Sequence, residues 1–126
     1  MKEEIKVFLE RAEIFERDAE FDFKNKNFDI CMFHLEQAAQ LLLKAKLLEI
    51  KGSFERTHSL RRLLLELAEK LDKKKIESFI QENKEVLRNL ERAYISSRYI
   101  YEEFFEDEVK KAFEVLKKLK SLLWKG

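Results

Sequence analysis

The chain offers almost nothing that would interrupt a helix. It contains no proline and only two glycines in 126 residues, and these are the residue types that most often end or kink helices. Apolar residues recur at helical spacing almost throughout, and no segment alternates between apolar and polar residues as a half-buried strand does. The pattern predicts an all-α fold.

Turn and cap signals divide this pattern into five segments. The first expected helix ends near residues 25–27, and the others cover about 28–50, 60–71, 76–101 and 107–124, with a break near 82–83. Gly52 is suited to end the second helix, Thr57 or Ser59 to begin the third, and residues 72–75 to close it. Because short connections favour antiparallel neighbours, we expect a single domain, residues 1–126. It should fold as an antiparallel up-and-down helical bundle of four long helices plus a shorter helix.

The second expected helix is unusual because it is apolar on several sides. Leu35 and Leu42 lie on one line of this helix, Met32 and Leu43 lie beside them, and Leu47 extends the apolar girth. A helix that is apolar over most of its circumference is buried between elements or at a subunit interface. We therefore expect a two-fold homodimer that buries part of this helix.

Positive and negative charges nearly cancel, because 26 Lys and Arg face 25 Asp and Glu for a net charge of +1. No global field attracts nucleic acid or anionic lipid, so a phosphate-binding role requires a local patch. The single Cys31 cannot form an internal disulfide, no apolar run approaches the roughly 20 residues that cross a bilayer, and residues 1–4 are no signal peptide. We expect a cytoplasmic protein that binds no membrane, and the Lys- and Glu-rich composition suggests a thermophilic source.

Four landmarks follow one another along the chain. They are the acidic pair Asp18 and Asp22, the Gln-Ala-Ala and Lys-Ala pattern at 37–39 and 44–45, Gly52 followed by Thr-His-Ser-Leu at 57–60, and Arg98 with Tyr99. In their order and spacing the chain resembles HEPN domains over nearly its whole length. The resemblance implies nucleotide binding and a minimal nucleotidyltransferase protein, encoded beside the gene, as partner. Some such pairs behave as toxin and antitoxin.

Catalytic HEPN proteins are metal-independent ribonucleases in which an Arg is followed a few residues later by a His, acting across a dimer. Here no His follows Arg98, and both His34 and His58 precede it. Cleavage of this type needs a group that exchanges protons near neutral pH, and His is the usual one. The sequence therefore favours a non-catalytic binding or regulatory module. Two alternatives stay open: a diverged ribonuclease in which another His reaches Arg98, and a homo-oligomeric interaction protein without a ligand.

The candidate nucleotide- or RNA-binding residues gather around Arg98. Tyr94, Arg98 and Tyr101 recur at i, i+4 and i+7 and so share one helix face, with Tyr99 beside them. A guanidinium flanked by aromatic rings can hold a phosphate while a base stacks alongside. Alternatively, the tyrosines continue the core and Arg98 pairs with a carboxylate.

A second candidate anion site lies at the start of the third expected helix. His58 stands there among Arg56, Arg61 and Arg62, the densest local run of positive charge. An imidazole or a bound anion at this position would meet the positive end of a helix. We therefore include His58 and Arg61 among the candidate binding residues.

Asp18 and Asp22 lie one turn apart at the edge of the first apolar stripe, and a carboxylate there needs a partner. We expect them to form a structural polar cluster with Arg98 or a His. A metal site is not expected, because the Glu55-x-x-His58 spacing occurs once where di-iron bundles use two, and zinc needs more ligands than a Cys-His pair supplies. No Gly-rich phosphate loop or other cofactor motif is present, so we expect no cofactor.

Overall fold

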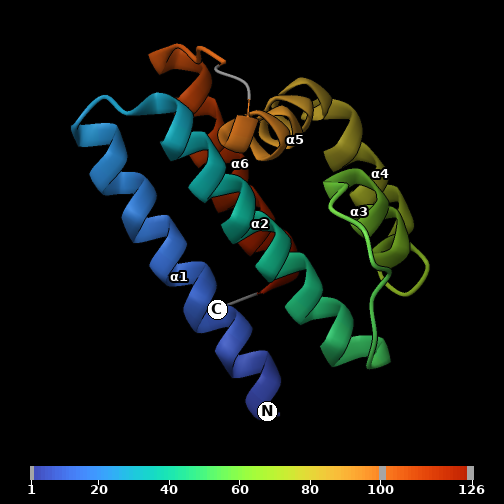
Figure 1. Cartoon of the computed structure of the whole chain (residues 1–126). Helices are drawn as coiled ribbons and strands as arrows, with labels where there is room; N and C mark the ends of the chain where they lie inside the picture. Colours follow the sequence, from blue (N-terminus) through green and yellow to red (C-terminus); the bar gives the residue numbers. More distant parts are fainter. Residues whose placement is uncertain (1, 100–101, 125–126) are drawn as a thin grey trace.

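The computed structural model describes the backbone of residues 2–99 and 102–124, and their side chains except those of residues 96–99. Six helices make up most of these residues: α1 (Glu3–Lys24), α2 (Phe28–Lys51), α3 (Leu60–Ala68), α4 (Lys73–Glu82), α5 (Lys84–Tyr99) and α6 (Glu106–Leu123). No strand occurs within the described ranges, and the predicted all-α bundle is confirmed (Figure 1). No helix among these residues is both long enough and apolar enough to cross a bilayer.

α1 and α2 form an antiparallel hairpin along one side of the molecule (Figure 1). The chain reverses at Lys26, whose φ is 60°, and the backbone N–H of Asn27 donates to the carbonyl of Asp22 at 2.9 Å. The rings of Phe23 and Phe28 flank this turn, with their centroids 5.7 Å apart. Because the turn is so short, it decides which residues of α1 face α2.

α2 is the central helix and packs against α1, α3, α5 and α6. Its buried apolar residues are Cys31, Met32, Leu35, Ala38, Ala39, Leu42, Leu43, Ala45 and Leu47. Helices of the same chain therefore cover the apolar girth from which a subunit interface was predicted. Burial between helices is one of the two environments expected of such a helix, and the homodimer stays a prediction.

The connection between α3 and α4 differs from the expected one. α3 ends at Ala68, and the Asp72 carboxylate accepts a hydrogen bond from the backbone N–H of Lys75 at 3.2 Å. Asp72 is thus the N-cap of α4, whereas residues 72–75 were expected to close the third helix. The physical reason is that a carboxylate satisfies a free N–H and is favoured by the positive end of a helix.

The expected break in the fourth helical segment lies at Asn83, which is buried. Its side-chain Nδ2 and its backbone N–H both donate to the carbonyl of Phe79, at 2.9 and 3.1 Å, which ends α4. Its own carbonyl accepts from the N–H of Leu87 at 2.9 Å and begins α5. One segment of the pattern therefore becomes two helices, which lie side by side with α3 (Figure 1).

Candidate functional site

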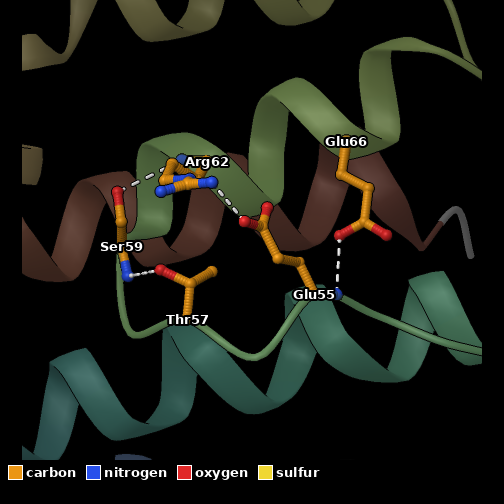
Figure 2. Close-up of polar contacts among 5 residues, drawn as sticks. All are labelled: Glu55, Thr57, Ser59, Arg62 and Glu66. Atoms are coloured by element: carbon orange, nitrogen blue, oxygen red, sulfur yellow. Dashed lines mark hydrogen bonds and ion pairs between the residues drawn. The ribbon is translucent and has the colours of Figure 1, made fainter.

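Polar contacts hold the loop that joins α2 to α3 (Figure 2). The backbone N–H of Glu55 donates to Oε1 of Glu66 at 3.0 Å, and Nζ of Lys51 donates to the second oxygen of the same carboxylate at 2.9 Å. The guanidinium of Arg62 pairs with the Glu55 carboxylate. These contacts tie the loop to α3 and fix how the chain approaches the start of that helix.

Ser59 connects the start of α3 to α5. Its Oγ accepts from the N–H of Arg62 at 3.2 Å and so caps α3, and its own N–H donates to Oγ1 of Thr57 at 3.1 Å (Figure 2). Oε1 of Glu91 on α5 accepts from the Ser59 hydroxyl at 3.3 Å and from the N–H of Arg61 at 3.4 Å. His58, which lies between Thr57 and Ser59, is therefore held close to α5.

His58 stacks on Tyr94 of α5. The two ring centroids are 4.4 Å apart at an interplanar angle of 26°, and Oη of Tyr94 lies 3.1 Å from Nε2 of His58 in a hydrogen bond. The His58 side chain is exposed and Tyr94 is half-buried. Two candidate residues that are 36 positions apart thus form one surface pair.

Arg98 follows Tyr94 by one turn of α5. Residues four apart on a helix have Cβ atoms about 5–6 Å from each other, so Arg98 begins on the same face as the His58–Tyr94 pair. The side chains of Arg98 and Tyr99 lie outside the described side chains, and Tyr101 lies outside the described residues. The role expected of these three residues stays a prediction.

The part that Arg61 plays in binding stays a prediction. Its backbone N–H bonds to Glu91, while its exposed side chain lines a groove between α3 and α5. The described contacts of the His58 ring are with Tyr94. Arg61 is therefore adjacent to the His58–Tyr94 pair along the chain without contacting it through a described side-chain interaction.

The acidic pair of α1 separates into two environments. Asp22 is buried, and its Oδ2 lies 2.5 Å from Nδ1 of His34 on α2, with the imidazole N–H donating to the carboxylate. Asp18 is exposed, and no described hydrogen bond or ion pair joins it to that pair. Of the two expected partners, Arg98 or a His, the structure shows a His, His34. It pairs with Asp22 and has no described contact with Asp18.

A row of rings links His34 to the His58–Tyr94 pair. Successive centroids are 5.7 Å apart between Phe15 and His34, 5.7 Å between His34 and Phe33, and 6.4 Å between Phe33 and Tyr94. We call Phe15, His34, Phe33, Tyr94 and His58 the aromatic row. It crosses α1, α2 and α5 and reaches the start of α3.

His34 and Phe33 were not among the candidate binding residues, although a His was one of the two partners expected for Asp18 and Asp22. A usable signal was present in the short turn between α1 and α2, because the hairpin brings residues on either side of it face to face. Asp22 and His34 are 12 positions apart across that turn. A carboxylate and an imidazole at such positions could have been paired before the structure was known.

Glu36 is a buried titratable residue that sequence reasoning missed. It is fully buried on α2, and its two oxygens accept hydrogen bonds from Nε2 of Gln37 at 2.8 Å and from Nε2 of Gln40 at 2.5 Å. Burial raises the pKa of the Glu36 carboxyl to about 7, although both glutamines and the charge of Lys44 oppose the rise. The signal was its position among apolar residues of α2.

The aromatic row combines stacking surface with two imidazoles, and Asp22 holds one of them, His34. Such groups can hold a base and a phosphate, or exchange protons with them. Within residues 2–99 and 102–124, no group of three or more His, Cys, Asp or Glu side chains lies close enough together to hold a metal ion.

The comparisons with known proteins agree with the resemblance noted in the sequence. The family model described as "HEPN domain" matches residues 5–125, nearly the whole chain. HEPN domains are nucleotide- or RNA-related modules, some of them of ribonuclease type, and they commonly dimerise. Neither the curated proteins nor the solved structures contain a match. The chain belongs to the HEPN domain family.

Proposed function

We propose that this protein is a non-catalytic module that binds a nucleotide or single-stranded RNA at the His58–Tyr94 pair and Arg98. The observation that carries the proposal is the stacked pair of rings one helical turn before Arg98. A planar guanidinium suits a phosphate because it donates two parallel hydrogen bonds, and a neighbouring ring offers a face to the base. The two requirements meet on one face of α5.

The module acts as a homodimer in this proposal, with the candidate site close to the subunit contact. Two large apolar side chains that neighbour residues of the aromatic row along the chain are exposed: Ile95 at 65% and Ile30 at 38%. Ile95 follows Tyr94 directly, and Ile30 precedes His34 by one turn of α2. Exposed apolar residues next to a polar site are typical of surfaces that contact a partner.

The binding proposal is tested by calorimetric titration of the protein with mononucleotides. Arg98→Lys keeps the positive charge but loses the planar fork, so we expect binding to weaken about ten-fold. The matched control is Arg92→Lys, the same substitution on the same helix at an arginine that pairs with Glu102.

Equal weakening in both variants, or none in Arg98→Lys, would show that Arg98 is structural. If wild-type protein binds neither mononucleotides nor short RNA, the proposed function is wrong. The remaining interpretation would then be a homo-oligomeric interaction protein without a ligand.

A diverged metal-independent ribonuclease is the second candidate. His58 lies against Tyr94, one turn before Arg98, despite the sequence order. The second imidazole, His34, is held by Asp22 farther along the aromatic row. In such cleavage the ribose 2′-oxygen bonds to phosphorus and its proton passes to one imidazole. The departing 5′-oxygen takes a proton from the other, which leaves a 2′,3′-cyclic phosphate.

We expect no cleavage, because no His follows Arg98 in the chain. The assay incubates single-stranded RNA with the protein and excess chelator, and compares wild type with His58→Ala, His34→Ala and Arg98→Ala. Cleavage that yields cyclic phosphate and disappears in Arg98→Ala and in either His variant would establish the ribonuclease and remove the non-catalytic proposal.

A small nucleotidyltransferase is the proposed protein partner, in a toxin–antitoxin relation. The family resemblance supports this proposal. The test is whether a nucleotidyltransferase encoded beside the gene binds the purified protein in size-exclusion chromatography. Separate elution of the two proteins at micromolar concentration would remove this partner from the proposal.

A further inference from the structure

α3, α4 and α5 lie on the opposite side of α2 from α1 (Figure 1), and a groove with a cationic lining lies between these three helices. It runs between α3, the end of α4 and the first half of α5, and has a volume of about 490 Å³. Its lining includes four cationic side chains, Arg61, Arg62, Lys84 and Arg88. We call it the α3–α5 groove.

Most of this positive charge is not neutralised within the described structure. Arg62 pairs with Glu55, but Arg61, Lys84 and Arg88 form no ion pair with any described residue, and all three are exposed. Among the described residues that line the groove, the acidic one is Glu91. In a chain with a net charge of +1, this is a concentrated local field of the kind that attracts polyanions.

The groove leads toward the candidate site. Lys84, Arg88 and Glu91 follow one another at i, i+4 and i+7 on α5, and Arg98 continues the same face at i+14. At 1.5 Å per residue the distance along the helix from Lys84 to Arg98 is about 21 Å. That length suits a run of successive phosphates better than one phosphate group.

We infer that the α3–α5 groove holds the phosphate backbone of a single-stranded RNA whose end rests on the His58–Tyr94 pair. The inference rests on the proposed function and names the path of the strand. Proteins that bind single strands combine a cationic groove with aromatic rings on which bases stack, and both parts are adjacent here. An acidic peptide would also meet the cationic rim, but it would not use the stacked rings.

Removing the negative charge of Glu91 should change RNA affinity in the opposite direction to removing a groove cation. The Glu91 carboxylate stands where the groove meets the start of α3, and its Oε1 accepts from the Ser59 hydroxyl and the Arg61 N–H. A phosphate passing this point is repelled by the negative charge. Glu91→Gln keeps an oxygen acceptor for both donors while removing that charge, so it should tighten RNA binding.

The experiment measures fluorescence anisotropy of labelled uridine oligomers of increasing length over a range of salt concentrations. Affinity should rise with length in wild type. Lys84→Gln and Arg88→Gln should each lower the slope of log K against log salt by about 0.7, equivalent to about four-fold weaker binding near 0.15 M salt. The matched control is Arg17→Gln, an exposed cation on α1 on the other side of α2.

The outcomes separate the inference from the proposed function. If Lys84→Gln and Arg88→Gln bind long oligomers as Arg17→Gln does, while Arg98→Lys still weakens mononucleotide binding, the groove inference is wrong and the proposed function stands. If the groove variants lose binding to polyglutamate but not to RNA, the groove is a protein-docking surface. If wild type binds mononucleotides but no oligomer, the groove inference alone is wrong, and if it binds neither, both are wrong. Far-ultraviolet circular dichroism checks that the surface variants keep their helices.

Discussion

Glu36 shows how one buried carboxyl can control the stability of this protein. Burial raises its pKa from an ordinary value of 4.5 to about 7, so the folded state favours the protonated form. The resulting stabilisation is fully present below pH 4.5 and is lost as the pH rises through 7. The shift corresponds to about 3 kcal/mol of unfolding free energy.

Glu36→Gln should therefore stabilise the protein at alkaline pH. A neutral amide cannot ionise, and a flip of the Gln37 amide keeps the hydrogen bonds paired. We expect the variant to exceed wild type by up to about 3 kcal/mol at pH 8, with a much smaller difference at pH 5. Urea denaturation at both pH values measures it. Glu10→Gln, at an exposed position on α1, is the control. Parallel pH profiles for wild type and Glu36→Gln would contradict the assignment.

At the scale of the helices, two positions with positive φ control where elements end. Gly52 ends α2 with φ of 75°, and a Cβ added there would meet nothing within 4 Å. Lys26 reverses the chain between α1 and α2 with φ of 60°, which is unfavourable for a residue with a side chain. The same backbone argument therefore predicts opposite effects for two substitutions.

Gly52→Ala should lower the free energy of unfolding by about 1–2 kcal/mol, since strain alone opposes the methyl group. Lys26→Gly should raise it by about 0.5 kcal/mol, because relief of the strain exceeds the greater flexibility of the unfolded chain. Denaturant midpoints measure both changes. Destabilisation of similar size in the two variants would be inconsistent with the left-handed conformation at Lys26.

At the scale of the whole molecule, the proposed homodimer forms through the face that carries the aromatic row. Most apolar side chains of α2 are buried by other helices of its own chain. The apolar side chains available for a subunit contact are exposed ones such as Ile95 of α5 and Ile30 of α2. HEPN domains commonly dimerise, and the proposed dimer uses this face.

Light scattering should report about twice the 15.3 kDa chain mass at micromolar concentration. Ile95→Lys should shift the protein to monomer, because a charge would then be buried without a partner. Ile14→Lys should leave the dimer intact, since this exposed apolar residue of α1 lines a different groove, beside Lys120 of α6. A monomeric mass for wild type would rule out the dimer. Disruption by both variants would show that the interface is not confined to the face that carries Ile95.

Much of the fold could be predicted from the sequence because it depends on local patterns. Apolar spacing located the helices, Gly52 supplied the end of α2, and Asn83 supplied the break before α5. Asp72 was misassigned because an Asp followed by lysines can close one helix or cap the next, and only the backbone distinguishes the two. The order of four motifs was enough to identify the family.

The site depended on contacts between distant residues. The sequence by itself determined the helices, the family and the missing His after Arg98. Tertiary packing alone decided that His34 meets Asp22, that His58 stacks on Tyr94, and that α2 is enclosed by its own chain. The physical reason is that periodicity specifies which face of a helix is apolar. It does not specify the angle and register at which two helices cross, and these bring polar side chains from different helices together.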